Sequence, residues 1–182
     1  MTAQILEAWA WTSELRNTTG GEAQRLYLEA IAENQKLNPE SLAVARLLKR
    51  IGVMLRQLDD LTQAEDYYRR ALTIAQKVAP NSLDVGRILL DLGRIAYKRG
   101  DLTEAERYER QALMITEKVA LGSIDDAWCL NALGLLRIEF SDFENAKKYL
   151  LQALAIREKL LPGGSMAGSS FLNLAIVCLA IT

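Results

Sequence analysis

Residues 92–118 read LGRIAYKRGDLTEAERYERQALMITEK, and the same pattern occurs once before and once after them. The other copies are residues 51–77, IGVMLRQLDDLTQAEDYYRRALTIAQK, and residues 133–159, LGLLRIEFSDFENAKKYLLQALAIREK. Successive copies are 41 residues apart and keep a glycine, an aspartate, an alanine, a tyrosine and a lysine at matching positions. A fixed period of this length is typical of a protein built from stacked structural repeats.

Each copy predicts two helices joined by a tight turn. In the middle copy, Leu89, Leu92, Gly93 and Ala96 follow the three-and-four spacing of one helical face. Gly100 is expected to end this first helix, and the stretch Asp101–Glu104 has the spacing of a capping box for the second. Period-two alternation is absent from every copy, so strands are not expected. The sequence therefore predicts an all-α fold of antiparallel helical hairpins.

The pattern continues in weaker form towards both ends of the chain. Trp11, Ala23 and Tyr27 keep its phase near the start, with Gly20–Gly21 expected as the turn, and residues 166–181 predict one last helix. We expect a single array of about 4.5 repeats over residues 1–182. Its repeats are expected at 3–37, 38–79, 80–120 and 121–161, with a half repeat at 162–182.

The composition argues against catalysis. The balance of charges argues against a partner that is attracted by the net charge of the protein. The 22 basic residues nearly balance the 23 acidic ones, so we expect neither nucleic acid nor a membrane as partner. The chain has no histidine, which is the commonest general base and metal ligand. We therefore expect no enzyme activity, no catalytic residues, no metal and no cofactor. The start has no basic leader, and residues 171–181 are too few to span a bilayer, so a cytoplasmic location is expected.

Several residues carry a resemblance to a known family. Leu92–Gly93, Ala105 and Ala112 at their spacings resemble the tetratricopeptide repeat, and residues 104–118 resemble its kinesin-light-chain type. This resemblance implies a right-handed superhelical α-solenoid that binds a peptide or protein. By the same resemblance, the chain is expected to be a bacterial fragment of a larger signalling protein. It also implies that the first helices of the hairpins line a concave groove.

Two features depart from the family pattern or need their own interpretation. Leucine stands where the family usually has tryptophan, and Glu109 stands where a second helix usually has an aromatic residue. We expect Glu109 at the edge of the packing, with its carboxylate in water. The acidic pairs Asp59–Asp60 and Asp125–Asp126 are expected to cap the helices that begin beside them, because carboxylates are favourable at helix amino termini.

The resemblance also selects candidate binding residues, because the family exposes fixed positions of each first helix. Carried over to this chain, these positions give the partner-binding candidates Arg46, Lys49, Arg50, Arg56, Arg87, Arg94, Tyr97, Lys98, Trp128, Asn131, Leu135 and Asn173. The earlier candidates are mostly basic, so the partner is expected to carry acidic residues that pair with the planar arginine groups. The later ones are apolar apart from two asparagines, whose amides suit a peptide backbone.

Two other interpretations remain open, and one is excluded. The runner-up is an assembly scaffold whose open carboxyl-terminal end stacks on further repeats or on another copy, because residues 166–181 are apolar around most of the helix. Self-association through these residues is part of that interpretation. Nucleic-acid binding rests only on the basic candidates and is not expected. Binding of chaperone tails is excluded, because Trp9 stands where the family's clamp needs an asparagine.

Overall fold

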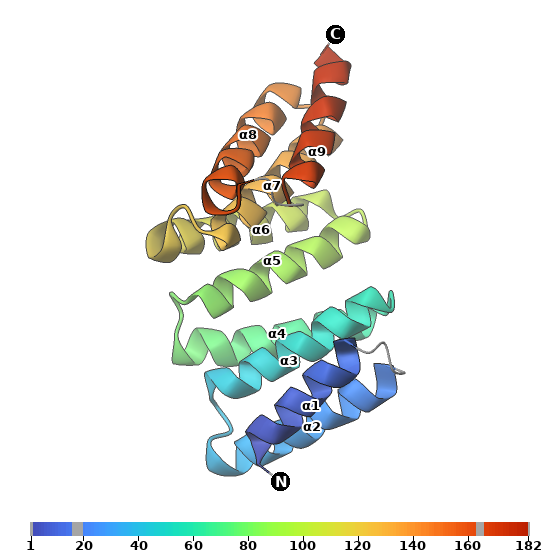
Figure 1. The fold of residues 1–182 in the computed structure, drawn as a ribbon, viewed down its shortest axis with the longest axis vertical. Coiled ribbons are helices and arrows are strands. Elements are labelled where there is room, and N and C mark those ends of the chain that lie inside the picture. Colours follow the sequence, from blue (N-terminus) through green and yellow to red (C-terminus); the bar gives the residue numbers. More distant parts are fainter. Residues whose placement is uncertain (1, 16–19, 163–165, 182) are drawn as a thin grey trace. The chain divides into compact units, whose positions relative to one another are not determined.

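The computed structural model describes residues 2–15, 20–162 and 166–181. In these residues the chain forms helices and no strands, which confirms the all-α prediction. Within residues 20–162, short turns join the helices (Figure 1). They are α1 (Ala3–Leu15), α2 (Gly20–Leu37), α3 (Leu42–Gln57), α4 (Leu61–Val78), α5 (Leu83–Lys98), α6 (Leu102–Ala120), α7 (Ile124–Glu139), α8 (Phe143–Leu160) and α9 (Met166–Ile181).

The chain divides into two compact units. Unit 1 covers Met1–Pro80 and contains the hairpins α1–α2 and α3–α4. Unit 2 covers Asn81–Thr182 and contains the hairpins α5–α6 and α7–α8, followed by α9. Each hairpin falls within one of the expected repeats. That the two units form one continuous array stays a prediction.

Two sets of capping residues, each repeated every 41 positions, set where the helices begin. Ser41, Ser82 and Ser123 cap α3, α5 and α7, and each hydroxyl accepts a hydrogen bond from the backbone amide three residues later. Asp60, Asp101 and Asp142 cap α4, α6 and α8 in the same way, as the Asp101 spacing predicts. Each cap satisfies an amide that the first helical turn leaves without a partner.

The turns inside the hairpins also share one backbone conformation. Asp59, Gly100 and Ser141 occupy equivalent positions and have φ values of 62°, 79° and 56°. Only glycine adopts this left-handed conformation without a steric cost, so the expected role of Gly100 at the helix end is confirmed. The expectation for Gly20–Gly21 was wrong, because both glycines belong to the first turn of α2.

The repeated glycine allows the two helices of a hairpin to pack closely. A Cβ atom added to Gly52 would lie 2.6 Å from Cε1 of Tyr68, and one added to Gly134 would lie 2.8 Å from Leu150. Gly93 faces Glu109 in the same way, at 2.9 Å from its Cγ. The second helices therefore each insert one large residue against a first helix at a point where no side chain projects.

Glu109 itself does not lie at the packing edge, as we had expected. Its side chain is 2% exposed and fills the space that Tyr68 and Leu150 fill in the neighbouring hairpins. Its Oε2 atom has no hydrogen-bond partner. Burial raises the pKa of Glu109 to about 8, although the positive charge of Arg94 acts in the opposite direction. Glu109 is buried despite its polarity, because the repeat register places its side chain inside the hairpin.

Candidate partner-binding site

The predicted binding residues all lie on first helices and keep part of their side chains exposed. Arg46, Lys49, Arg50 and Arg56 lie on α3 in unit 1. In unit 2, the remaining candidates are Arg87, Arg94, Tyr97 and Lys98 on α5, Trp128, Asn131 and Leu135 on α7, and Asn173 on α9. Their exposure makes them available at a surface, but their local surroundings differ sharply between the units.

In unit 1 the candidate face is a concentration of positive charge. Helix α3 contains four basic residues and no acidic one. The guanidinium of Arg50 lies over the ring of Trp11 on α1, with its Cζ atom 4.4 Å from the ring centroid. Trp11 stands 41 residues before Gly52, so it occupies the position at which the other hairpins have their contact glycine, and it remains 44% exposed. The face thus combines several cations with an accessible aromatic ring.

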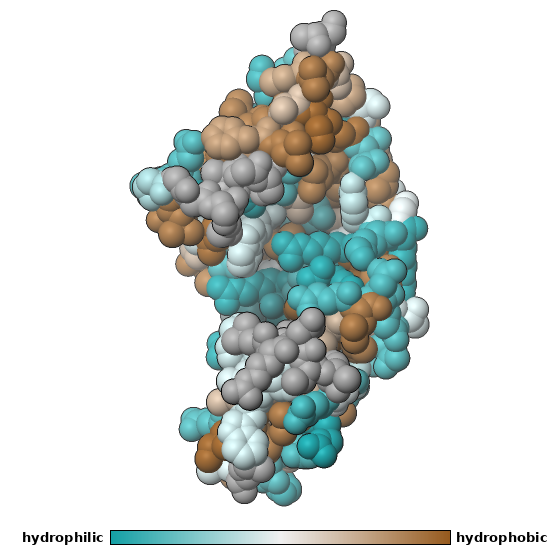
Figure 2. Space-filling model, turned by 45° about the vertical axis from the view of Figure 1, so that its right-hand side comes forward, coloured by the Kyte–Doolittle hydropathy of each residue, from teal (hydrophilic) through white to brown (hydrophobic). Residues whose placement is uncertain are grey.

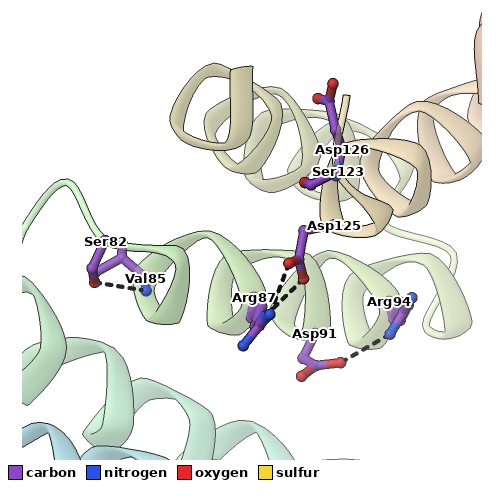
Figure 3. Close-up of polar contacts among 8 residues, drawn as sticks. All are labelled: Ser82, Val85, Arg87, Asp91, Arg94, Ser123, Asp125 and Asp126. Atoms are coloured by element: carbon purple, nitrogen blue, oxygen red, sulfur yellow. Dashed lines mark hydrogen bonds and ion pairs between the residues drawn. The ribbon is translucent and has the colours of Figure 1, made fainter. Parts of the chain in front are cut away.

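In unit 2, Arg87 forms an ion pair within the protein. Arg87 on α5 donates two hydrogen bonds to the carboxylate of Asp125 on α7, at 2.7 Å from Nε and 2.8 Å from Nη2 (Figure 3). Asp125 is only 3% exposed. The hydrogen bonds to Asp125 raise the pKa of Arg87 above its usual value, so its guanidinium is charged at any physiological pH. The ion pair connects the first helices of two successive hairpins.

The acidic pair at the start of α7 therefore does not cap that helix as expected. Ser123 is the capping residue, and Asp126 is buried behind it (Figure 3). The Asp126 carboxylate accepts hydrogen bonds from the Thr116 hydroxyl and from the Gly122 amide. Both aspartates thus hold neighbouring elements of unit 2 together.

Two more candidates on α5 have partners within unit 2. Arg94 lies 3.1 Å from the carboxylate of Asp91, one turn earlier on the same helix (Figure 3). The Tyr97 hydroxyl donates a 2.6 Å hydrogen bond to Glu139 on α7. Burial, together with this hydrogen bond, raises the pKa of Tyr97 to about 12. The positive charge expected along α5 is therefore largely balanced by nearby carboxylates.

The two asparagine candidates meet in a polar cluster at the other side of α7. The side-chain amide of Asn173 lies 3.5 Å from Oδ1 of Asn131, and Arg157 on α8 donates to the same oxygen at 3.4 Å. Arg157 also donates to the hydroxyl of Ser170 on α9, and burial lowers its pKa. The cluster connects α7, α8 and α9. Both asparagines remain half-buried, so part of each amide is open to solvent.

The sequence did not show which residues would be internal partners of the candidates. Asp125, Trp11 and Arg157 each contact a predicted candidate. For Asp125 a signal existed, because Arg87 and Asp125 are 38 residues apart, one helical turn less than the repeat period. For Trp11 and Arg157 the repeat register alone gives no such signal.

Cys129 on α7 is almost fully buried, and burial raises the pKa of its thiol to about 12. Among the side chains in the described ranges, no group of three histidine, cysteine, aspartate or glutamate residues is arranged to hold a metal ion. None of the described helices is both long and apolar enough to cross a membrane.

Helical hairpins that repeat every 41 residues and expose a set of side chains on their first helices define a helical-repeat module for protein–protein interaction. The model of the tetratricopeptide repeat matches residues 15–77, 43–118 and 84–159. The chain belongs to the tetratricopeptide repeat family.

Two solved structures share the fold. BtubC (BKLC) from P. vanneervenii is 24% identical, with a TM-score of 0.85, and the match covers 97% of this chain and 71% of that one. The apo form of RapI is 17% identical, with a TM-score of 0.77, and the match covers 97% of this chain and 49% of that one. No curated protein sequence matches the chain. Both similarities show a shared fold.

Proposed function

We propose that the protein is a non-catalytic interaction module that binds a segment of a partner protein on its first helices. In this proposal, acidic residues of the partner lie against α3. Membership of the tetratricopeptide repeat family and the exposure of the candidate side chains support the general role. The charge distribution among the first helices supports the preference for an acidic segment.

The difference between α3 and α5 carries the proposal. Helix α3 has four basic residues and no acidic one, whereas α5 contains Asp84 and Asp91 beside its three basic residues. We therefore place the acidic part of the partner at Arg46, Lys49, Arg50 and Arg56, where an arginine fork can pair with a carboxylate.

Unit 2 offers a second, less charged surface of its own to a partner segment. Trp128 and Leu135 on α7 are half-exposed and suit apolar residues, while Asn131 and Asn173 can donate to and accept from a peptide backbone. A half-exposed tryptophan is a common anchor at protein interfaces, and its removal often costs about 2 kcal/mol or more. Trp128→Ala should therefore weaken binding of a partner segment without changing the preference of the protein for acidic residues.

Selection of short random peptides on the immobilised protein tests the proposal. Peptides selected by the wild type should be enriched in aspartate and glutamate, and their affinity should fall as the salt concentration rises. The variant Arg46→Glu with Arg50→Glu should lose this enrichment, because the sign of the α3 face is changed.

A matched control reverses the same amount of charge elsewhere in unit 1. Arg69→Glu with Arg70→Glu alters two exposed arginines of α4, a second helix, and should leave the peptide preference unchanged. Circular dichroism should show the same helix content in all three proteins. The proposal is overturned if the selected peptides lack acidic enrichment, or if both double variants change the preference equally.

A second candidate function is assembly with another polypeptide through the end of unit 2. Helix α9 exposes Phe171, Leu172, Ile176 and Leu179, and Figure 2 shows the apolar surface gathered over this helix. A contiguous apolar surface of this kind on a soluble protein often marks an interaction site. This role is independent of α3, because it uses apolar contacts rather than charge.

A further inference from the structure

Arg157 on α8 is a charged residue at a register position that the earlier second helices fill with neutral side chains. Stepping back from Arg157 by 41 residues at a time gives Thr116 on α6, Ala75 on α4 and Asn34 on α2. Arg157 is 6% exposed and Thr116 is 1% exposed, so in unit 2 this position belongs to the packed interior. Burial of a cation is costly, and a nearby negative charge offsets that cost.

The preceding hairpin shows what this register position can contact. The Thr116 hydroxyl donates a 3.1 Å hydrogen bond to Oδ1 of Asp126 on α7. A carboxylate supplied by the next first helix therefore lies within hydrogen-bonding distance of the position. The residue 41 places after Asp126 is Ala167. The sequence thus matches a threonine with an aspartate in one repeat and an arginine with an alanine in the next.

The described hydrogen bonds of Arg157 go to neutral oxygens on both neighbouring first helices. Its Nη1 atom donates to Oδ1 of Asn131 on α7 at 3.4 Å and to the hydroxyl of Ser170 on α9. Nδ2 of Asn173 on α9 lies 3.5 Å from the same Asn131 oxygen. Burial lowers the pKa of Arg157, because the surroundings favour the charged guanidinium less than water does. A negative group that reached this cluster would stabilise that charge.

These contacts also fix which way the Asn131 amide points. Its Oδ1 atom accepts from Arg157 and Asn173, so the groups that Asn131 can offer to a ligand are the two N–H donors of Nδ2. Both asparagines are partly exposed, and α9 contains no acidic residue. The exposed side of the cluster is therefore rich in donors and lies in front of a positive charge.

We infer that Asn131, Asn173 and Arg157 form a binding site for a carboxylate group of the partner segment. The inference rests on the role proposed for the unit 2 surface and names the chemical group that this surface selects. The two asparagine amides donate to the carboxylate. Arg157 is a positioning residue that holds Asn131 with its donors outward and adds positive charge behind it. Hydrogen bonds to an ionised acceptor are about twice as strong as neutral ones, so a carboxylate should be preferred to a backbone carbonyl.

Three small probes test this preference by NMR spectroscopy of the ¹⁵N-labelled full chain at constant ionic strength. N-acetylglycine carries a chain-terminal carboxylate, the α-amide of N-acetylaspartic acid carries a side-chain carboxylate, and N-acetylasparagine amide is neutral. The side-chain amide signals are assigned by their loss in Asn131→Ala and Asn173→Ala. At least one acid should shift both signals saturably, and the neutral probe should not. The acid that binds more tightly identifies the source of the carboxylate.

Variants of Arg157 separate its effect on binding from a purely structural role. Arg157→Met replaces a buried charge by an apolar side chain of similar length, so it should fold, but it should lose the saturable response. Arg157→Lys keeps the charge and can donate to Asn131, so it should retain the response. The control is Arg110→Met on α6, which removes the same charge from an exposed side chain and should respond like the wild type.

Asn131→Asp provides a second, independent measurement. This nearly isosteric change places a carboxylate beside Arg157, where the ligand is proposed to act. It should raise the midpoint of thermal unfolding and abolish the response of the Asn173 signal to both acids. The variant keeps the test decisive if Arg157→Met fails to fold.

Four results would overturn the inference. They are the absence of a saturable response to either acid, an equal response to the neutral probe, a wild-type response in Arg157→Met, and a lower unfolding midpoint in Asn131→Asp. The acidic enrichment of peptides selected on α3 should be the same in Arg157→Met and in the wild type. Failure of the carboxylate site therefore leaves the α3 proposal intact, and the two failures can be told apart.

Discussion

The hairpins α3–α4 and α5–α6 have the same helix lengths to within one residue, equivalent serine and aspartate caps and the same left-handed turn, yet they differ in two respects. The buried residue opposite the glycine is Tyr68 in the first and Glu109 in the second. The first helix α3 has four basic residues and no acidic one, whereas α5 contains Asp84 and Asp91 as well as basic residues. Caps, turns and the glycine therefore determine the hairpin, while the residues between them set its stability and its affinity for partners.

Replacing Glu109 should have the largest effect on stability. Its pKa is raised from 4.5 to about 8 in the folded protein, so the buried neutral form stabilises the fold at low pH. As the pH rises from about 4.5 to about 8, Glu109 ionises in the unfolded chain but stays neutral in the folded protein. The free energy of unfolding therefore falls, by on the order of 4 kcal/mol in total. Glu109→Leu, which copies Leu150, should abolish this loss and stabilise the protein at pH 8.

Urea unfolding at several pH values between 5 and 9 checks this prediction, with pH values chosen as ~1-unit steps across the titration. The wild type should become less stable across this range, and Glu109→Leu should not follow it. Glu117→Gln is a suitable control, because Glu117 lies on the same helix but is exposed. If the wild type and Glu109→Leu show parallel pH profiles, the buried carboxylate does not control stability.

The second-largest effect on stability should come from a methyl group added at the contact glycine of α3. Gly52→Ala would place a Cβ atom 2.6 Å from the fully buried ring of Tyr68, so the helices would have to move apart, at a cost of about 1–3 kcal/mol. Gly86→Ala on α5 is the matched control, because its Cβ would lie 3.5 Å from the nearest atom, in ordinary contact. That variant should gain roughly 0.5–1 kcal/mol from helix propensity. Thermal unfolding of both variants would show opposite shifts; equal shifts would contradict the close-packing argument.

The smallest of the three effects concerns the arginines. Arg87→Ala leaves the buried Asp125 carboxylate without its bidentate partner, and because Arg87 is itself about half exposed we expect a loss of about 1–2 kcal/mol. Arg50→Ala removes only the contact with the exposed ring of Trp11, worth about 0.5–1 kcal/mol. A double-mutant cycle between Arg87 and Asp125 would measure the first value directly. Similar losses for both arginines would show that the two faces are not different in the way we describe.

The fold was predictable because it depends on local signals that recur at one period. The aspartate caps, Gly100 and the contact glycines Gly93 and Gly134 can all be identified from residue type and spacing. Gly93 and Gly134 lie close to Ala105 and Ala146, with the carbonyl oxygen of each alanine 3.5 Å from the added Cβ position. Glu109 was misplaced because polarity suggests exposure, whereas the register fixes which side chain points into the hairpin.

The candidate site was predictable only as a set of positions. The register identifies which side chains of the first helices are partly exposed, but it does not say which of them already have internal partners. Arg87, for example, pairs with Asp125 of the next hairpin, and this contact appears only when the helices are packed together.

The two cysteines differ in a way that gives α9 a built-in reporter. Cys129 is buried and its raised pKa of about 12 suppresses the reactive thiolate, whereas Cys178 is exposed on α9. A maleimide dye should therefore attach to Cys178 in the native wild-type chain and leave Cys129 untouched. Labelling becomes slower when something covers α9, so the modification rate at a single natural thiol measures occupancy of this helix without any engineered residue.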